Sequence, residues 1–224
     1  MSLLSSLKSK TSGSKFSTPV NFNYVLYKGL IPLLRALFSS FIIRGRIKLP
    51  LYLGKRVTVR NKHLLESGKG LYLGDYSYID CLSKQGIKIG ERVTIREFAW
   101  IQLTSTLSNP GEQISIGHHT YIGPRVVIGA AAPVFIGNNC QLGSGVNLIA
   151  ENHQFSADQK IFDQEVTRKG IKIGDDCWIG NNVIILDGVE IGSGCVIGAG
   201  SVVSKSLPEK IVAAGIPAKI IKSR

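Results

Sequence analysis

Residues 171–204 read IKIGDDCWIGNNVIILDGVEIGSGCVIGAGSVVS, and an aliphatic side chain returns in them at every sixth position. A helix repeats every 3.6 residues, so a spacing of six excludes a helix. The residue two places before each of these positions is small or medium-sized, and alternation puts both on one side of a strand. Each hexad therefore predicts a short strand with two inward side chains and a turn. The aliphatic positions are Ile173, Ile179, Ile185, Ile191, Ile197 and Val203.

The same period runs through the preceding part of the chain. It is clear in residues 114–148 and looser back to Leu53. A single hexad cannot bury its own apolar face, so the repeats must stack into a continuous core. We therefore predict an all-β chain whose solenoid, a parallel β-helix, spans residues 51–206, followed by a short tail at 207–224.

Three of the four cysteines occupy the small inward position of a hexad. They are Cys140, Cys177 and Cys195, at places where Val, Thr or Ser stands in other repeats. A small buried hydrophobe explains them better than a nucleophile or metal ligand does. Four cysteines in 224 residues also make no disulfide framework, so we expect a reducing, cytoplasmic setting.

Positive charge is concentrated at one end of the chain. The formal net charge is +12, yet the first acidic residue is Glu66, and residues 1–65 hold all of the excess. Such an asymmetry predicts an anionic partner. It does not by itself indicate nucleic acid, because the basic segment has no interleaved aromatic or zinc-finger pattern.

The segment before the repeats divides into two parts. Residues 1–20 are rich in Ser and Lys and predict a disordered lead-in. Residues 21–50 predict a basic helical arm in which Pro32 suits the first turn and Leu33, Leu37 and Phe38 share an apolar face. About 12 helical residues span about 18 Å, too little for a bilayer core of about 30 Å. Two alternatives stay open: a helix packed on the solenoid, or a helix lying on an anionic membrane.

The largest break in the repeat is an inserted loop at residues 151–170. A long excursion from a strict repeat is usually functional. His153 lies at its start, in the string Glu151-Asn152-His153-Gln154-Phe155. Imidazole titrates near neutral pH, so His153 is a candidate general base, and Glu151 is either its orienting partner or a solvated charge.

The hexads, the histidine string and three later segments resemble the hexapeptide-repeat acyltransferases, in particular the sugar O-acetyltransferases. The later segments are GDDCWIG at 174–180, VIGAGSVV at 196–203 and AGIPAK at 214–219. The resemblance implies a left-handed, three-sided coil, acetyl-CoA as co-substrate, a carbohydrate acceptor and a homotrimer. It implies O-acetylation of a sugar in a surface polysaccharide or its lipid-linked precursor, with N-acetylation of an amino sugar as the alternative.

The same resemblance implies the residues on the coenzyme side. Arg125 takes the place of an Asn that family members use near the reacting carbonyl, which makes it a candidate substrate residue. An outward indole at position 178 calls for cover by a ligand or a neighbouring subunit. The implied coenzyme-binding positions are Trp178, Gly180, Asn181, Ala199, Ser204, Lys205, Lys219 and Lys222.

Two other function classes were weighed against this one. A zinc site needs three converging ligands, but His118 and His119 are adjacent in the chain and point to opposite sides of a strand. We therefore expect no metal. A non-catalytic solenoid scaffold would need neither His153 nor the later segments, and coenzyme binding separates it from an enzyme.

Overall fold

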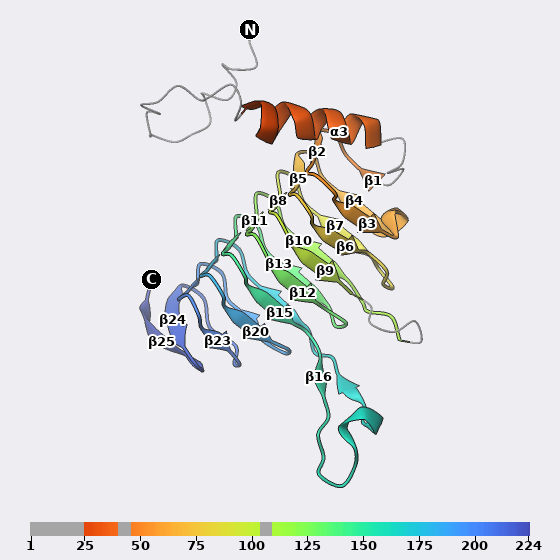
Figure 1. Ribbon diagram of the computed structural model, residues 1–224. Coiled ribbons are helices and arrows are strands. Elements are labelled where there is room, and N and C mark those ends of the chain that lie inside the picture. Colours follow the sequence, from red (N-terminus) through yellow and green to blue (C-terminus); the bar gives the residue numbers. More distant parts are fainter. Residues whose placement is uncertain (1–24, 40–45, 104–108) are drawn as a thin grey trace.

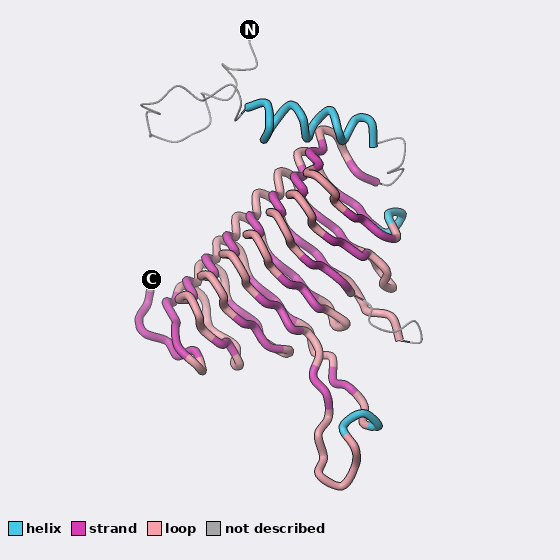
Figure 2. The backbone as a smooth tube through the Cα atoms, viewed as in Figure 1, coloured by secondary structure: helices cyan, strands magenta, loops and turns pink. Residues whose placement is uncertain are grey.

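The computed structural model describes residues 25–39, 46–103 and 109–224 (Figure 1). Three parallel sheets form the walls of a solenoid, and successive strands of the chain lie in successive walls. Helix α3 lies across the N-terminal end, β24 and β25 close the other end, and one long loop projects from the side (Figure 2). We name the walls sheets A, B and C.

Sheet A and sheet B extend over the whole length of the solenoid. Sheet A is built of β1 (Arg46–Ile47), β4 (Leu65–Ser67), β7 (Ile87–Ile89), β10 (Ile114–Ile116), β13 (Val134–Ile136), β18 (Ile171–Ile173) and β21 (Glu190–Ile191). Sheet B is built of β2 (Leu51–Leu53), β5 (Leu71–Leu73), β8 (Thr94–Ile95), β11 (Tyr121–Ile122), β14 (Gln141–Leu142), β19 (Trp178–Ile179), β22 (Val196–Ile197), β24 (Ile211–Gly215) and β25 (Ala218–Ser223).

Sheet C completes the triangle, and a small fourth sheet lies outside it. Sheet C is built of β3 (Thr58–Arg60), β6 (Tyr78–Asp80), β9 (Trp100–Gln102), β12 (Val127–Gly129), β15 (Asn147–Ile149), β20 (Ile184–Leu186) and β23 (Val202–Val203). The fourth sheet pairs β16 (Asn152–His153) with β17 (Val166–Thr167) in the projecting loop. Two short 3₁₀ helices, η2 (Lys62–Leu64) and η3 (Ile161–Asp163), lie in turns.

The register of the sheets aligns like residues in columns along the axis. Ile114 and Ile116 pair with Val134 and Ile136, which in turn pair with Ile171 and Ile173. These side chains are at most 3% exposed, and together with the other inward hexad residues they form one continuous core. The stacking begins at Arg46 and includes β24 and β25, because the C-terminal residues from 211 pair with β22 and then turn back as a hairpin.

The cysteines lie where the hexad pattern predicts. Cys140, Cys177 and Cys195 are at most 2% exposed, and Cys81 is fully buried; all four are free thiols. Burial raises the pKa of Cys81 to about 12 and also raises the pKa of Cys195. Buried thiols of this kind are core packing rather than nucleophiles.

The helical arm begins with a π-helical segment, η1 (Leu26–Leu30), and continues as α3 (Ile31–Ser39). Its solenoid-facing side is made of small or short residues, because Pro32 is buried and Ala36 is 0% exposed. Arg35 donates from Nη1 to the Leu53 carbonyl at 3.2 Å. Gly45, a residue type that suits the C-terminal cap of this helix, lies outside the described residues.

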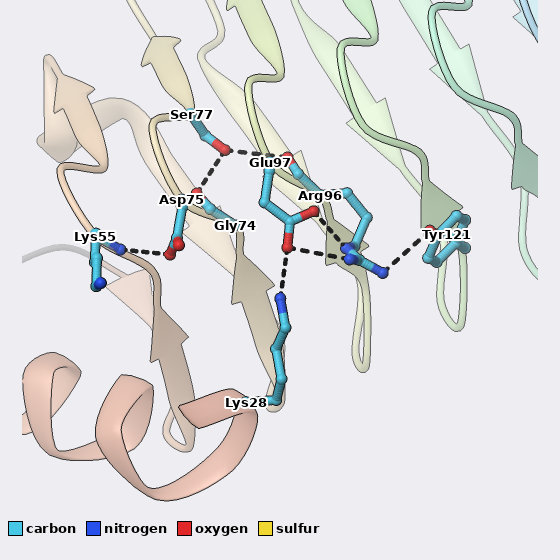
Figure 3. A network of polar contacts seen from close by, with 8 residues as sticks. All are labelled: Lys28, Lys55, Gly74, Asp75, Ser77, Arg96, Glu97 and Tyr121. Atoms are coloured by element: carbon cyan, nitrogen blue, oxygen red, sulfur yellow. Dashed lines mark hydrogen bonds and ion pairs between the residues drawn. The ribbon is translucent and has the colours of Figure 1, made fainter. Parts of the chain in front are cut away.

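A polar network fastens the arm to the third coil (Figure 3). Lys28 Nζ lies 2.8 Å from Glu97 Oε1, and Arg96 donates to the same carboxylate from Nε at 2.8 Å. Burial alone would raise the pKa of Glu97, but the hydrogen bonds from Arg96 and Lys28 outweigh it and hold the pKa at about 2. The arm is therefore packed against the solenoid. Within the described ranges, no helix is long and apolar enough to cross a membrane.

Candidate active site

The inserted loop leaves the solenoid after β15, at the edge where sheet C meets sheet A. Its two arms pair as an antiparallel ladder in which His153 lies opposite Val166. The His153 side chain is exposed. It lines an open hollow of about 760 Å³ together with Asn152, Gln154, Phe155, Ser156 and Thr167. An exposed imidazole in an open hollow can reach a ligand from outside the chain.

A half-buried ion pair closes the base of this loop. Arg168 Nε donates to Glu151 Oε2 at 2.8 Å, and the two side chains are 18% and 22% exposed. Arg168 Nη1 also donates to the Asn109 carbonyl at 3.3 Å. Among the residues that the structure describes, no hydrogen bond joins Glu151 to His153. The carboxylate therefore holds the loop base, and Arg168 is a residue that the hexad pattern could not single out.

Gly180, Asn181 and Ala199 meet at another edge, where sheet B turns into sheet C. Gly180 lies directly over Ala199, so a Cβ at position 180 would be 2.6 Å from the Ala199 nitrogen. The Asn181 carbonyl accepts a hydrogen bond from Gly200 at 2.8 Å, and Asn181 Oδ1 accepts one from the Ser144 amide at 2.9 Å. Hydrogen bonds between coils hold this corner in place.

Trp178 and Lys222 lie on one line across the outer face of sheet B. The register runs from Trp178 through Val196 and Val212 to Lys222. The Trp178 side chain is 58% exposed, and Lys219 is exposed on the same hairpin opposite Ala214. An apolar strip thus ends in two cations, a combination suited to a ligand with an apolar arm and a phosphate end.

Ser204 and Lys205 lie on a different edge from these residues. They follow β23 and precede Ser206, whose hydroxyl accepts a hydrogen bond from the Glu190 amide at the start of β21. This is the edge between sheets C and A, the same edge from which the His153 loop departs. Sheet C separates it from the corner that holds Gly180. Within one chain, His153 and that corner are therefore not brought together.

Arg125 belongs to a column of corner residues that share a left-handed backbone. Its φ is 57°, and its amide donates to the Glu97 carbonyl at 2.9 Å. In the earlier coils this position is filled by large side chains: Tyr76 and Phe98 stack with ring centroids 5.4 Å apart, and Arg56 lies 5.9 Å from the Tyr76 ring centroid. In the later coils the position is occupied by Gly145, Asn182 and Gly200.

Arg125 thus marks the point at which this column changes from large to small residues. Toward the N-terminus the corner is a ridge of rings and guanidinium groups. Toward the C-terminus it is open and exposes backbone beside Gly180 and Asn181. Neither the stacking nor the opening can be deduced from one hexad, because successive members of the column are about 20 or more residues apart.

Two segments of the solenoid match known families of sequence repeats. The family model described as bacterial transferase hexapeptide (six repeats) matches residues 170–205. A second, described as hexapeptide repeat of succinyl-transferase, matches residues 113–150. Residues 113–150 and 170–205 therefore contain hexapeptide repeats. The expected fold class, a left-handed parallel β-helix with an N-terminal helix, is confirmed.

Two similar proteins have names that include an enzymatic activity. The chain is 36% identical over 129 residues to the galactoside O-acetyltransferase of Escherichia coli, covering 58% of this chain and 63% of that one. It is 28% identical to the polySia-specific acetyltransferase NeuO, whose crystal structure matches with a TM-score of 0.52 over 80% of this chain and 70% of that one. A second structure, that of the N-acyltransferase AntD of Bacillus cereus, is 16% identical with a TM-score of 0.58 over 85% and 88% of the chains, which shows the fold alone.

The matches to curated relatives are partial. The chain spans between 57% and 65% of the length of three such relatives.

The described residues contain no group of three or more His, Cys, Asp or Glu side chains arranged to hold a metal ion. His118 instead accepts a hydrogen bond at Nδ1 from the Glu91 amide at 3.0 Å.

Proposed function

We propose that this hexapeptide-repeat protein is an acetyl-CoA-dependent acetyltransferase that modifies a hydroxyl group of a carbohydrate. The observation that carries the proposal is the exposed His153 at the base of the one long loop that interrupts the hexads in residues 109–224. The activities named for the Escherichia coli galactoside enzyme and for NeuO support it.

The proposed reaction needs one general base and one binding site that holds the coenzyme beside the acceptor. The acceptor oxygen attacks the thioester carbonyl while His153 takes the hydroxyl proton. The carbon–sulfur bond then breaks, and the departing thiolate takes the proton back from the imidazolium. No covalent intermediate on the protein is required. Holding the two substrates side by side supplies much of the rate.

We assign the coenzyme to the open half of the corner column. Gly145, Asn182 and Gly200 carry no large side chain there, which leaves room for an extended pantetheine arm beside Gly180, Asn181 and Ala199. Trp178 offers an apolar surface beside it. Lys219 and Lys222 offer point charges for the nucleotide phosphates, since a lysine ammonium binds phosphate without strict geometry. Ser204 and Lys205, on the other edge of sheet C, would contact the coenzyme only from a neighbouring chain.

We assign the acceptor to the region around Arg125, where the ridge meets the open corner. Tyr76 and Phe98 precede it with exposed fractions of 46% and 53%. A carbohydrate in a surface polysaccharide, or its lipid-linked precursor, fits this position best. The Arg125 side chain would bind a hydroxyl, a carboxylate or the carbonyl oxygen of the thioester.

We further propose a homotrimer whose active sites lie between chains. The projecting loop exposes large apolar side chains: Phe155 is 80% and Phe162 96% exposed. Exposure of this size calls for cover by a partner. A neighbour would also bring its His153 to the corner of the next chain, which one chain does not do for itself. The four buried free thiols suit a cytoplasmic location.

The test is release of free thiol from acetyl-CoA in the presence of a panel of acceptors. The panel contains neutral oligosaccharides, anionic polysaccharides and lipid-linked sugars. Amino sugars are added to it to test for N-acetylation. Acceptor-dependent release that forms an alkali-labile ester supports the proposal. A protein that binds no coenzyme A and releases no thiol with any acceptor would be a scaffold, and the proposal would be rejected.

A further inference from the structure

The arm carries a second apolar surface on the side away from the solenoid. Tyr27 is 61%, Leu30 46%, Leu34 43% and Leu37 46% exposed. Their spacing of three, four and three residues places them along one side of the helix, opposite the buried Ala36. We call this set the outer stripe. A helix that packs on a domain through one side normally has a polar opposite side, so the outer stripe needs a separate explanation.

The end of the solenoid on which the arm lies is basic. Lys48, Lys55 and Arg56 on the first coil are exposed, and Leu49 between them in sequence is 50% exposed. No acidic residue occurs before Glu66, and residues 1–65 hold the whole net charge of +12. Glu97, which approaches the arm from the third coil, is neutralised by Lys28 and Arg96. The face as a whole is therefore apolar and cationic.

We infer that the outer stripe and these basic residues form a docking surface for an anionic lipid bilayer. An in-plane helix enters the boundary between headgroups and acyl chains through its apolar side, and basic residues around it are drawn to anionic headgroups. The charge complementarity favours this partner over a second copy of the chain, because two such faces would bring like charges together. The inference is independent of the proposed acetyl transfer.

The position of the arm makes this docking compatible with access to the loop. The helix lies across the N-terminal end of the solenoid, and the coils recede from it (Figure 1). The His153 loop leaves after β15, four coils beyond β3 in sheet C. At about 4.8 Å per coil this is about 19 Å from the first coil. A bilayer held against the arm would leave the loop in water.

The experiment is co-sedimentation of the full chain with vesicles, without acetyl-CoA. The probes are vesicles of neutral phosphatidylcholine and vesicles containing one quarter phosphatidylglycerol. The test variant is Leu30→Ser, Leu34→Ser, Leu37→Ser, and the control is Phe135→Ser, which removes a 40% exposed apolar side chain from sheet A. We expect binding to the anionic vesicles, weakened by salt, and a loss of about tenfold or more in the triple variant.

Circular dichroism and light scattering on the same samples keep the outcomes separate. The triple variant should keep its thermal transition and its oligomeric mass, because the outer stripe is exposed. Equal vesicle binding by wild type and triple variant, or equal binding to neutral and anionic vesicles, overturns the inference. Dissociation of the oligomer in the triple variant would also overturn it, because a second copy of the chain would then cover the outer stripe. A fall of many degrees in the melting temperature of the triple variant would overturn it too, because the chain itself would then cover the stripe.

Discussion

Arg168 and Glu151 form a half-buried ion pair, 2.8 Å from Nε to Oε2, across the two strands that carry the inserted loop away from the solenoid. The pair joins the residue just before β16 to the residue just after β17. It therefore sets the angle at which His153 is presented, without contacting His153.

Breaking this pair should impair the loop and spare the coenzyme side. We expect Arg168→Met to lower kcat by about tenfold or more, because a misplaced base loses much of its advantage, while the Kd for coenzyme A stays within about twofold. Hydrogen exchange of residues 152–167 should become faster. Arg168→Lys, which keeps the charge, should recover part of both effects. Unchanged exchange in Arg168→Met would show that the pair does not hold the loop.

Replacing the proposed base should separate chemistry from binding. We expect His153→Ala to lower kcat by about 10²–10⁴, the usual contribution of a positioned general base. Because His153 is exposed, its loss should leave the thermal transition and coenzyme A affinity nearly unchanged. The matched control is Gln159→Ala, an exposed side chain of the same loop outside the hollow. Wild-type turnover in His153→Ala would reject the assignment of the base.

The glycine at the B–C corner should resist even a methyl group. A Cβ at Gly180 would lie 2.6 Å from the Ala199 nitrogen and 2.8 Å from the Ile197 carbonyl oxygen, and backbone atoms cannot rotate away. We expect Gly180→Ala to cost about 1–3 kcal/mol, the usual range for overpacking, and to lower the melting temperature. At Gly129 the nearest atom, on Trp100, is 3.9 Å from the added Cβ. Gly129→Ala is therefore the control, with a change within about 0.5 kcal/mol.

Attachment of the arm should weaken in acid. The pKa of Glu97 lies at about 2, below its ordinary 4.5, so the carboxylate stabilises the folded state above about pH 4.5. That contribution is lost as the pH falls toward 2. The protection factors of the arm amides, which correct the exchange rates for the intrinsic pH dependence of exchange, should fall over this window in the wild-type protein. Glu97→Gln should show lower protection factors already at neutral pH and little further change over this window. A wild-type arm with the same protection at pH 2.5 and pH 6 would contradict the role given to the Lys28 pair.

The four thiols should be unreactive toward thiol reagents in the folded protein. All are buried, burial raises the pKa of Cys81 to about 12, and a hydrogen bond with Cys140 together with burial raises the pKa of Cys177. A thiol reagent at pH 8 should label none of them in minutes and all four after unfolding in denaturant. Rapid labelling of one thiol in the native state would show that its inward position in the solenoid is accessible to solvent.

Much of this protein is determined by local sequence alone. Each hexad decides its own strand, inward residues and turn, so the solenoid, the buried positions of Cys140, Cys177 and Cys195, and the interruption at 151–170 can all be predicted from spacing. The exposed Trp178 follows from the same alternation, because it stands between two inward residues. These features depend on neighbours within six residues.

Contacts between residues far apart in the chain were decided only by the tertiary structure. Glu151 meets Arg168 across 17 residues, and Lys28 meets Glu97 across 69. The edge on which each residue lies depends on the number of residues in every preceding turn. The arm shows the same limit: spacing identified its leucines, but only packing on the first coil decided that Ala36 faces inward and Leu34 outward, because a close approach of helix to sheet requires the smaller side chain.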